Sequence, residues 1–136
     1  MNTRTVRLMA LGVVVIHFAV VVLHSIAHEV LAVKASPAQL AFIIPVIIVA
    51  PVVAGIVLTR FARAGTILLT ASMFGSLVFG VYYHFIADTI DHVAHVAFLE
   101  PVFWSQIFQL TAFLLALAEM FGTGLGLILL LRSQRH

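Results

Sequence analysis

The chain contains no cysteine and very little charge. Of its 136 residues, 9% are charged and 63% are hydrophobic. The absence of cysteine excludes disulfides, thiolate metal sites, iron–sulfur clusters and cysteine nucleophiles. A soluble domain has about 25% charged residues, so this chain has too few charges to cover a surface in contact with water. A surface that faces lipid needs none, and the composition therefore predicts an integral membrane protein.

Four apolar segments are long enough to cross a bilayer, which takes about 20 mostly apolar residues per helix. They cover about 8–32, 40–58, 66–86 and 102–131. The linkers between them are short, which favours antiparallel neighbours. We therefore predict an all-α fold, an integral membrane four-helix up-down bundle, in which residues 1–136 form a single domain.

Two of these segments carry features that need an explanation. The first has arginines before an apolar stretch, as a cleaved signal peptide does. The stretch is longer than the roughly 7–15 residues of a signal sequence, and it includes His17 and His24; we expect a retained helix. The second segment contains Pro45 and Pro51. Proline removes a backbone donor, so we expect a bend there.

Arginine and lysine are distributed unevenly along the chain. Only Lys34 falls on one side of the predicted bundle, and the other six residues fall on the opposite side. These six are Arg4, Arg7, Arg60, Arg63, Arg132 and Arg135. Cytoplasmic loops are enriched in these residue types. We predict cytoplasmic N- and C-termini in a multi-pass protein of the cell membrane, the inner or plasma membrane of a prokaryote, with no role for nucleic acid.

Histidine is unusually frequent for such an apolar chain. The sequence has seven, of which His136 ends the chain and indicates nothing. The others form one group on the first segment and one group on or after the third. They are His17, His24 and His28, and His84, His92 and His95. At about 100° per residue, the first group points within an arc of about 40° and so occupies one helix face.

A second polar stripe follows from the third segment if its helix continues beyond the membrane edge. Positions 84, 88, 91 and 95 then point within about 60° of one another. They carry His84, Asp88, Asp91 and His95, with His92 on the flank. Counting helical rise from Arg7 and from Arg63 puts His28 and His84 at about the same height. Polar groups that face lipid are costly, so we predict that the two stripes meet inside the bundle.

This combination of side chains is typical of a metal site. Neutral imidazole and carboxylate together bind zinc, iron, manganese or copper, and four-helix bundles hold such ions in their cores. A lone histidine is more simply explained as an interfacial polar residue, but the clustering favours a site. We predict a divalent transition metal, zinc or iron first and copper next. Its predicted ligands are His24, His28, His84, Asp88, His92 and His95.

Glu119 lies near the middle of the fourth segment. Counted from Arg132, its height falls between those of His17 and His24. A carboxyl group inside a membrane indicates a function by default, either as a ligand or as a proton carrier between His17 and the outer histidines. The structural alternative is a protonated acid bonded to backbone or to Gln109. We predict Glu119 and Asp91 as catalytic residues.

Three functions fit these residues. The first is a metal-dependent membrane enzyme or redox protein that acts on a lipid-soluble substrate at the extracytoplasmic end of the bundle. The second is a subunit that binds b-type haem between His28 and His84, with Gly80 leaving room for the flat ring. The third is a proton or metal-ion transporter or an accessory subunit without catalysis, which acts as a homo-oligomer or within a larger membrane complex. The carboxylates in the second stripe rank a non-haem metal first, because haem iron does not use them.

Overall fold

The computed structural model describes residues 3–133, most of which are helical and none of which lies in a strand. Its four longest helical stretches are each long and apolar enough to cross a membrane: Thr3–Val30, Pro37–Arg60, Ala62–Ile86 and Val102–Ser133. They overlap the four predicted segments, so the all-α class and the four apolar helices of membrane-spanning length are confirmed. Arg135 and His136 lie outside the described residues.

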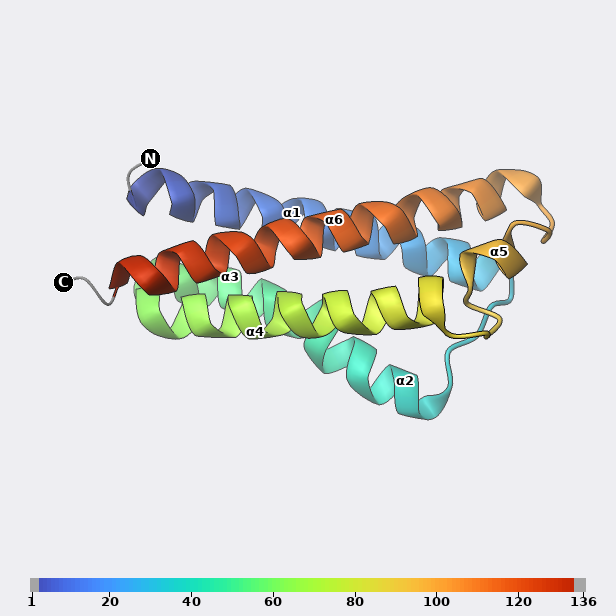
Figure 1. Cartoon of the computed structure of the whole chain (residues 1–136), viewed down its shortest axis with the longest axis horizontal. Helices are drawn as coiled ribbons and strands as arrows, with labels where there is room; N and C mark the ends of the chain where they lie inside the picture. The colour runs from blue at the N-terminus through green and yellow to red at the C-terminus, as the bar shows by residue number, and fades with distance from the viewer. Residues whose placement is uncertain (1–2, 134–136) are drawn as a thin grey trace.

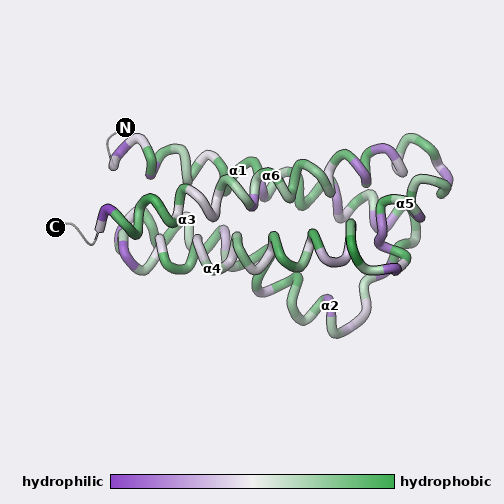
Figure 2. Tube along the Cα trace, viewed as in Figure 1, coloured by the Kyte–Doolittle hydropathy of each residue, from purple (hydrophilic) through white to green (hydrophobic). Residues whose placement is uncertain are grey.

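The helices lie side by side along one long axis (Figure 1). α1 (Thr3–Val30) packs against α6 (Val102–Ser133), and α4 (Ala62–Val81) packs against α6 and against α3 (Ala50–Arg60). The start of α1 and the end of α6 lie at the same end of the bundle. Figure 2 shows hydrophobic residues along the length of the bundle and hydrophilic residues gathered towards its two ends. Many large hydrophobic side chains are exposed, among them Val15, Ile56 and Phe113, and such a surface suits contact with lipid.

The second span is not one regular helix. α2 (Pro37–Phe42) leads into a π-helical segment, η1 (Ile43–Val49), which continues into α3. Pro45 lies within η1 and Pro51 lies in the first turn of α3. Proline cannot donate to the helical ladder, and the expected irregularity is confirmed. In Figure 1, α2 diverges from α4 at the end of the bundle where α5 (Val93–Val96) lies.

The third span ends earlier than the second polar stripe requires. Its last turn is π-helical, η2 (Tyr82–Ile86), and Ala87 is already extended, with φ −73° and ψ 133°. A loop follows, and then the short α5. The predicted continuous helix through position 95 is therefore wrong. Beyond the apolar segment the backbone can bond to water, and Asp side chains compete with the helical ladder.

Candidate metal centre

Three histidines converge at the end of the bundle that α5 covers. His24 and His28 come from consecutive turns of α1, and His84 comes from η2. One ligand nitrogen from each ring lies within 4.8 Å of the other two. His24 and His84 are buried, and His28 is half-buried. The prediction that the two helices bring these three residues together is confirmed, and the cluster can hold a metal ion.

The rings of these three histidines pack around one aromatic side chain. The ring of Phe108 on α6 lies 4.6 Å from that of His24, 4.7 Å from that of His28 and 5.4 Å from that of His84, measured between centroids. Phe108 is fully buried. It closes one side of the cluster with an apolar surface, which keeps water away from the rings and limits their rotation.

The Nδ1 atoms of His28 and His84 each donate a hydrogen bond to a backbone carbonyl. His28 donates to Val33 over 2.8 Å, and His84 donates to Asp91 over 3.0 Å. A carbonyl oxygen only accepts, so the proton of each neutral ring is on Nδ1. The Nε2 atom of each ring therefore has a free lone pair.

His24 reaches the same state through a side chain. Its Nδ1 atom lies 2.8 Å from the Thr111 hydroxyl oxygen. That hydroxyl has one hydrogen, which it donates to the Ile107 carbonyl over 2.6 Å or the Phe108 carbonyl over 3.0 Å. When the hydroxyl donates to one of these carbonyls, its oxygen accepts from His24 Nδ1, and the Nε2 lone pair of His24 is free. Histidines that bind metals usually donate their other ring N–H to an oxygen in this manner.

The free nitrogens of His24 and His28 face each other at short range. The two Nε2 atoms are 3.2 Å apart. Without an ion, one ring can donate a hydrogen bond to the other across this distance, whereas a shared cation would attract both lone pairs. Two nitrogen ligands of a tetrahedral zinc ion, each about 2.0–2.1 Å from the metal, are about 3.3 Å apart. The spacing therefore matches that of two ligands on one ion.

A cavity of about 330 Å³ adjoins the three rings. It lies between α1, η1, α4 and α6, and most of the residues that line it are apolar. Its size falls in the range of small-molecule sites, about 300–1,000 Å³. A catalytic zinc ion typically has three protein ligands and one exchangeable position. Three imidazoles beside a cavity supply this arrangement.

Asp91 belongs to the same cavity, although its carboxylate is not among the three converging ligands. Its side chain is buried, and Oδ2 accepts a hydrogen bond from Gln39 over 3.2 Å. Oδ1 is buried and has no hydrogen-bond partner among the described residues. Asp91 thus orients His84 through its carbonyl and brings a carboxylate to the cavity wall.

The structure places the other predicted ligands away from the three histidines. Asp88 has a 93% exposed side chain, and its Oδ1 lies 3.2 Å from Nε2 of His95. The Nδ1 of His95 donates to the Thr89 carbonyl over 2.7 Å, while the Nδ1 of His92 accepts from the backbone N–H of Ala94. These residues follow the end of η2, so the loop carries them out of the stripe on which their prediction as metal ligands depended.

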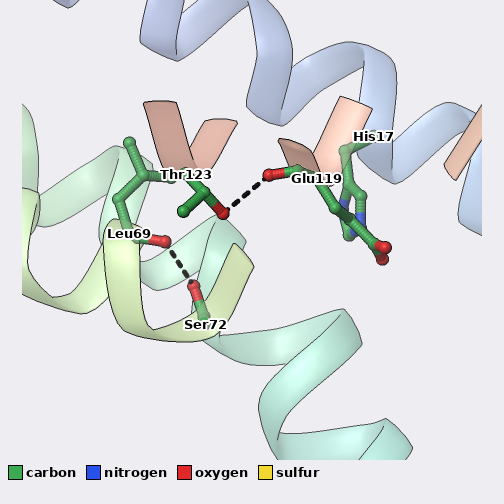
Figure 3. A network of polar contacts seen from close by, with 5 residues as sticks. All are labelled: His17, Leu69, Ser72, Glu119 and Thr123. Atoms are coloured by element: carbon green, nitrogen blue, oxygen red, sulfur yellow. Dashed lines mark hydrogen bonds and ion pairs between the residues drawn. The ribbon is translucent and has the colours of Figure 1, made fainter. Parts of the chain in front are cut away.

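Glu119 forms a separate polar contact deeper in the bundle. Its Oε1 lies 3.2 Å from Nε2 of His17, and both side chains are almost completely buried (Figure 3). The Thr123 hydroxyl donates to the backbone carbonyl of Glu119 over 2.7 Å. Gln109, the partner that a purely structural acid was expected to have, donates instead to Ser105. Glu119 also lines the cavity that adjoins the three histidines.

Thr111 and Phe108 belong to the cluster but were not predicted from the sequence. Of the two, only Thr111 could have been noticed in the sequence, because it is an isolated hydroxyl within an apolar helix at about the height of His24.

We expect Thr111→Val to weaken metal binding about 10- to 100-fold, because His24 loses the acceptor that fixes its tautomer. Competition with a chelator measures the affinity. Thr123→Val removes a hydroxyl from the same helix away from the cluster, and an equal loss in both variants would contradict the role of Thr111.

Comparison of the chain with protein-family models, with curated proteins and with solved structures found no match. The fold and the cluster define a class: a helical protein with four apolar helices of membrane-spanning length and a three-histidine group that can hold a metal ion. A more specific function has to be inferred from the geometry of the cluster and its cavity.

Proposed function

We propose that this protein is a metal-dependent membrane enzyme or redox protein that acts on a lipid-soluble substrate. The observation that carries the proposal is the state of His24, His28 and His84. The Nδ1 atom of each ring lies within hydrogen-bond distance of an oxygen, and one nitrogen of each ring lies within 4.8 Å of the other two, so the three rings can share one ion. The adjoining cavity gives a substrate access to that ion.

Zinc is the metal that the ligand set favours. Three neutral imidazoles with one exchangeable position are an arrangement that catalytic zinc uses. Iron is the next choice, because non-haem iron sites often combine histidines with a carboxylate, which Asp91 can supply. A zinc ion held by the three histidines would polarise an oxygen atom bound to it, and the Asp91 carboxylate in the cavity wall would accept the proton that this oxygen releases.

A lipid-soluble substrate is supported by the walls of the cavity. They include Ile43, Ile47, Phe79 and Leu115. Leu40 and Ile44 line the same cavity and are 43% and 52% exposed. In a bilayer, the exposed parts of these two side chains contact lipid, so a molecule dissolved in the membrane meets the rim of the cavity directly.

Haem fits these residues less well. A porphyrin between His28 and His84 needs the space around the midpoint of their rings, which are 6.1 Å apart between centroids. The rings of His24 and Phe108 flank that space, each within 5.4 Å of both histidine rings. The proposal therefore assigns His28 and His84 to a single ion together with His24.

A transporter is the alternative from another class, and the His17–Glu119 contact is the observation that favours it. A path through the bundle would have to continue from this pair towards the start of α1. That part of the bundle is filled by an apolar cluster of packed side chains. It consists of Val6, Ala10, Val14, Ala54, Leu58, Leu69, Met73, Leu125 and Leu129. We therefore rank the enzyme above the transporter.

The proposal includes a topology. We propose an up-down bundle in a prokaryotic cell membrane with both termini in the cytoplasm, which puts the metal site at the extracytoplasmic end. The arginine distribution supports it.

Reporter fusions test this topology. We expect a reporter protein fused to either terminus to give the signal of a cytoplasmic location. A reporter signal from the outer side at either end would contradict this topology and the side assigned to the site.

Metal content tests the proposed function. We expect the protein purified in detergent to retain close to one zinc or iron ion per chain, because three buried or half-buried ligands hold it. Elemental analysis measures the ion, and an optical spectrum of the same sample tests for haem. A sharp Soret band would favour the haem alternative, and a protein that binds no transition metal even after loading would overturn the proposal.

A further inference from the structure

The cavity has polar groups at two separate places and apolar walls between them. His24 and His84 line one part, Glu119 lines another, and side chains such as Ile47 and Leu115 lie along the walls. On α6 the residues that line the cavity run from Ala112 to Glu119, seven positions that correspond to about 10 Å of helical rise. A molecule that contacts both polar groups must therefore be elongated and largely apolar.

The carboxyl group of Glu119 has one oxygen without a partner. Oε1 faces His17, but Oε2 is buried and has no hydrogen bond to any described residue. The side chain as a whole is only 2% exposed. A buried polar atom without a partner is costly, so a native protein usually provides one. The bound molecule is the available source.

The space next to that oxygen is kept open by small residues. Gly80 lines the cavity, and a Cβ atom at this position would lie 3.7 Å from Oε2 of Glu119. Ala112 and Ala116 line the same cavity from α6. Longer side chains at these positions would fill it. Small residues at three positions on two helices therefore leave room for the cavity.

We propose that this cavity binds an elongated lipid-soluble alcohol, whose hydroxyl group bonds to Glu119 and whose far end lies at the metal. A hydroxyl both donates and accepts, so it pairs with Oε2 whether the carboxyl group is ionised or protonated. The inference rests on the proposed function, because it takes the three-histidine metal as the reacting centre. Glu119 then positions the substrate.

A route from the lipid supports this class of substrate. An apolar groove on the outer side of α1 shares Val21, Ser25, Glu29 and Ile48 with the cavity. The remaining residues of the groove all belong to α1: Phe18, Val22, Ile26 and Val30. A long-chain alcohol can lie along this groove in the membrane and move sideways between α1 and η1 into the cavity.

Photolabelling with a fatty alcohol tests the inference. The probe is a long-chain primary alcohol with a diazirine in the chain, added to the metal-loaded protein in detergent. We expect labelled peptides from the cavity walls, and competition by dodecanol but not by dodecane. Glu119→Leu should reduce this labelling about tenfold, as expected for the loss of one hydrogen bond to a carboxyl group. Glu119→Gln, which keeps hydrogen-bonding capacity, should retain most of it.

Matched variants control for folding and for labelling outside the cavity. Met120→Leu changes the neighbouring exposed position and should behave as wild type. Ala116→Leu fills the cavity and should abolish specific labelling, whereas Ala71→Leu, at an exposed position of α4 that does not line it, should not. If Glu119→Leu does not fold, the comparison of Ala116→Leu with Ala71→Leu and the competition with dodecane decide whether the cavity binds the alcohol.

The outcomes separate this inference from the proposed function. Equal competition by dodecane and dodecanol, or equal labelling of Ala116→Leu and Ala71→Leu, would overturn the alcohol site even if the protein holds its metal. Labelling that depends on Glu119 in a protein that binds no metal would support the alcohol site and overturn the metal centre. Elemental analysis of each labelled sample distinguishes the two cases.

Discussion

Replacing His24, His28 or His84 by alanine is expected to weaken metal binding by more than about 100-fold. Loss of a residue that only orients a ligand weakens metal binding about 10- to 100-fold, and loss of the ligand itself should weaken it more. The purified variants should then hold far less than one ion per chain. Each of the three offers one ligand nitrogen to the same cluster, so the three substitutions should have similar effects. Elemental analysis after desalting in detergent measures the occupancy.

His17→Ala is the matched control for this prediction. It removes an imidazole from α1, the helix that also carries His24 and His28. This imidazole is as deeply buried as that of His24, but it contacts Glu119 and not the cluster. His95→Ala removes an exposed imidazole outside the cluster. Both controls should retain their metal. Equal occupancy in the cluster variants and the controls would remove the case for a site shared by the three histidines.

Gly65→Ala is expected to destabilise the protein by about 3 kcal/mol, the upper part of the usual cost of overpacking. α3 and α4 are joined through the single residue Phe61, which brings Gly65 against the backbone of Leu58. A Cβ at position 65 would be closer to the backbone nitrogen and Cα of Leu58 than real Cβ atoms come. Backbone cannot rotate away as a side chain can, so the two helices must separate.

Gly124→Ala is the control for this substitution, and its expected effect has the opposite sign. A Cβ at position 124 meets nothing within 4 Å, so the change should be neutral or stabilise the helix by up to about 1 kcal/mol. Thermal unfolding in detergent, followed by circular dichroism, compares the two variants. A Gly65→Ala protein as stable as wild type would contradict the close packing of α3 on α4.

The spans and the three-histidine cluster could be predicted because they depend on regular quantities. Lipid requires long apolar segments, and helical rise and rotation are fixed, so depth and direction can be counted along the chain. Counting from Arg7 and Arg63 matched His28 with His84, whose rings lie 6.1 Å apart between centroids. The spacing of His24 and His28 placed them on one face.

The remaining parts of the site depend on irregular backbone and on contacts between distant helices. The loop after Ile86 removed Asp88 and His95 from the predicted stripe, because a helix that leaves the apolar segment no longer has to continue. Thr111 reaches His24 across a separation of 87 positions. Sequence periodicity contains no information about such a contact, which follows from how α6 packs against α1.

The cavity was also beyond a reading of the sequence. It depends on the π-helical segment around Pro45 and on small residues that line it, such as Ala116. A π-helical segment often marks a functional site, but its position is set by tertiary packing. Glu119 was predicted to be functional from its depth alone. In the structure Glu119 lines the cavity, and its Oε2 has no hydrogen-bond partner among the described residues.

X-ray absorption at the metal edge of the loaded protein tests most directly that three imidazoles hold one ion. For zinc, we predict three imidazole nitrogens and one further light atom, with the nitrogens at about 2.0–2.1 Å. One imidazole should disappear from the spectrum of His84→Ala if that variant is loaded with excess zinc. A spectrum without histidine ligands, or one that His84→Ala leaves unchanged, would contradict the metal centre described here.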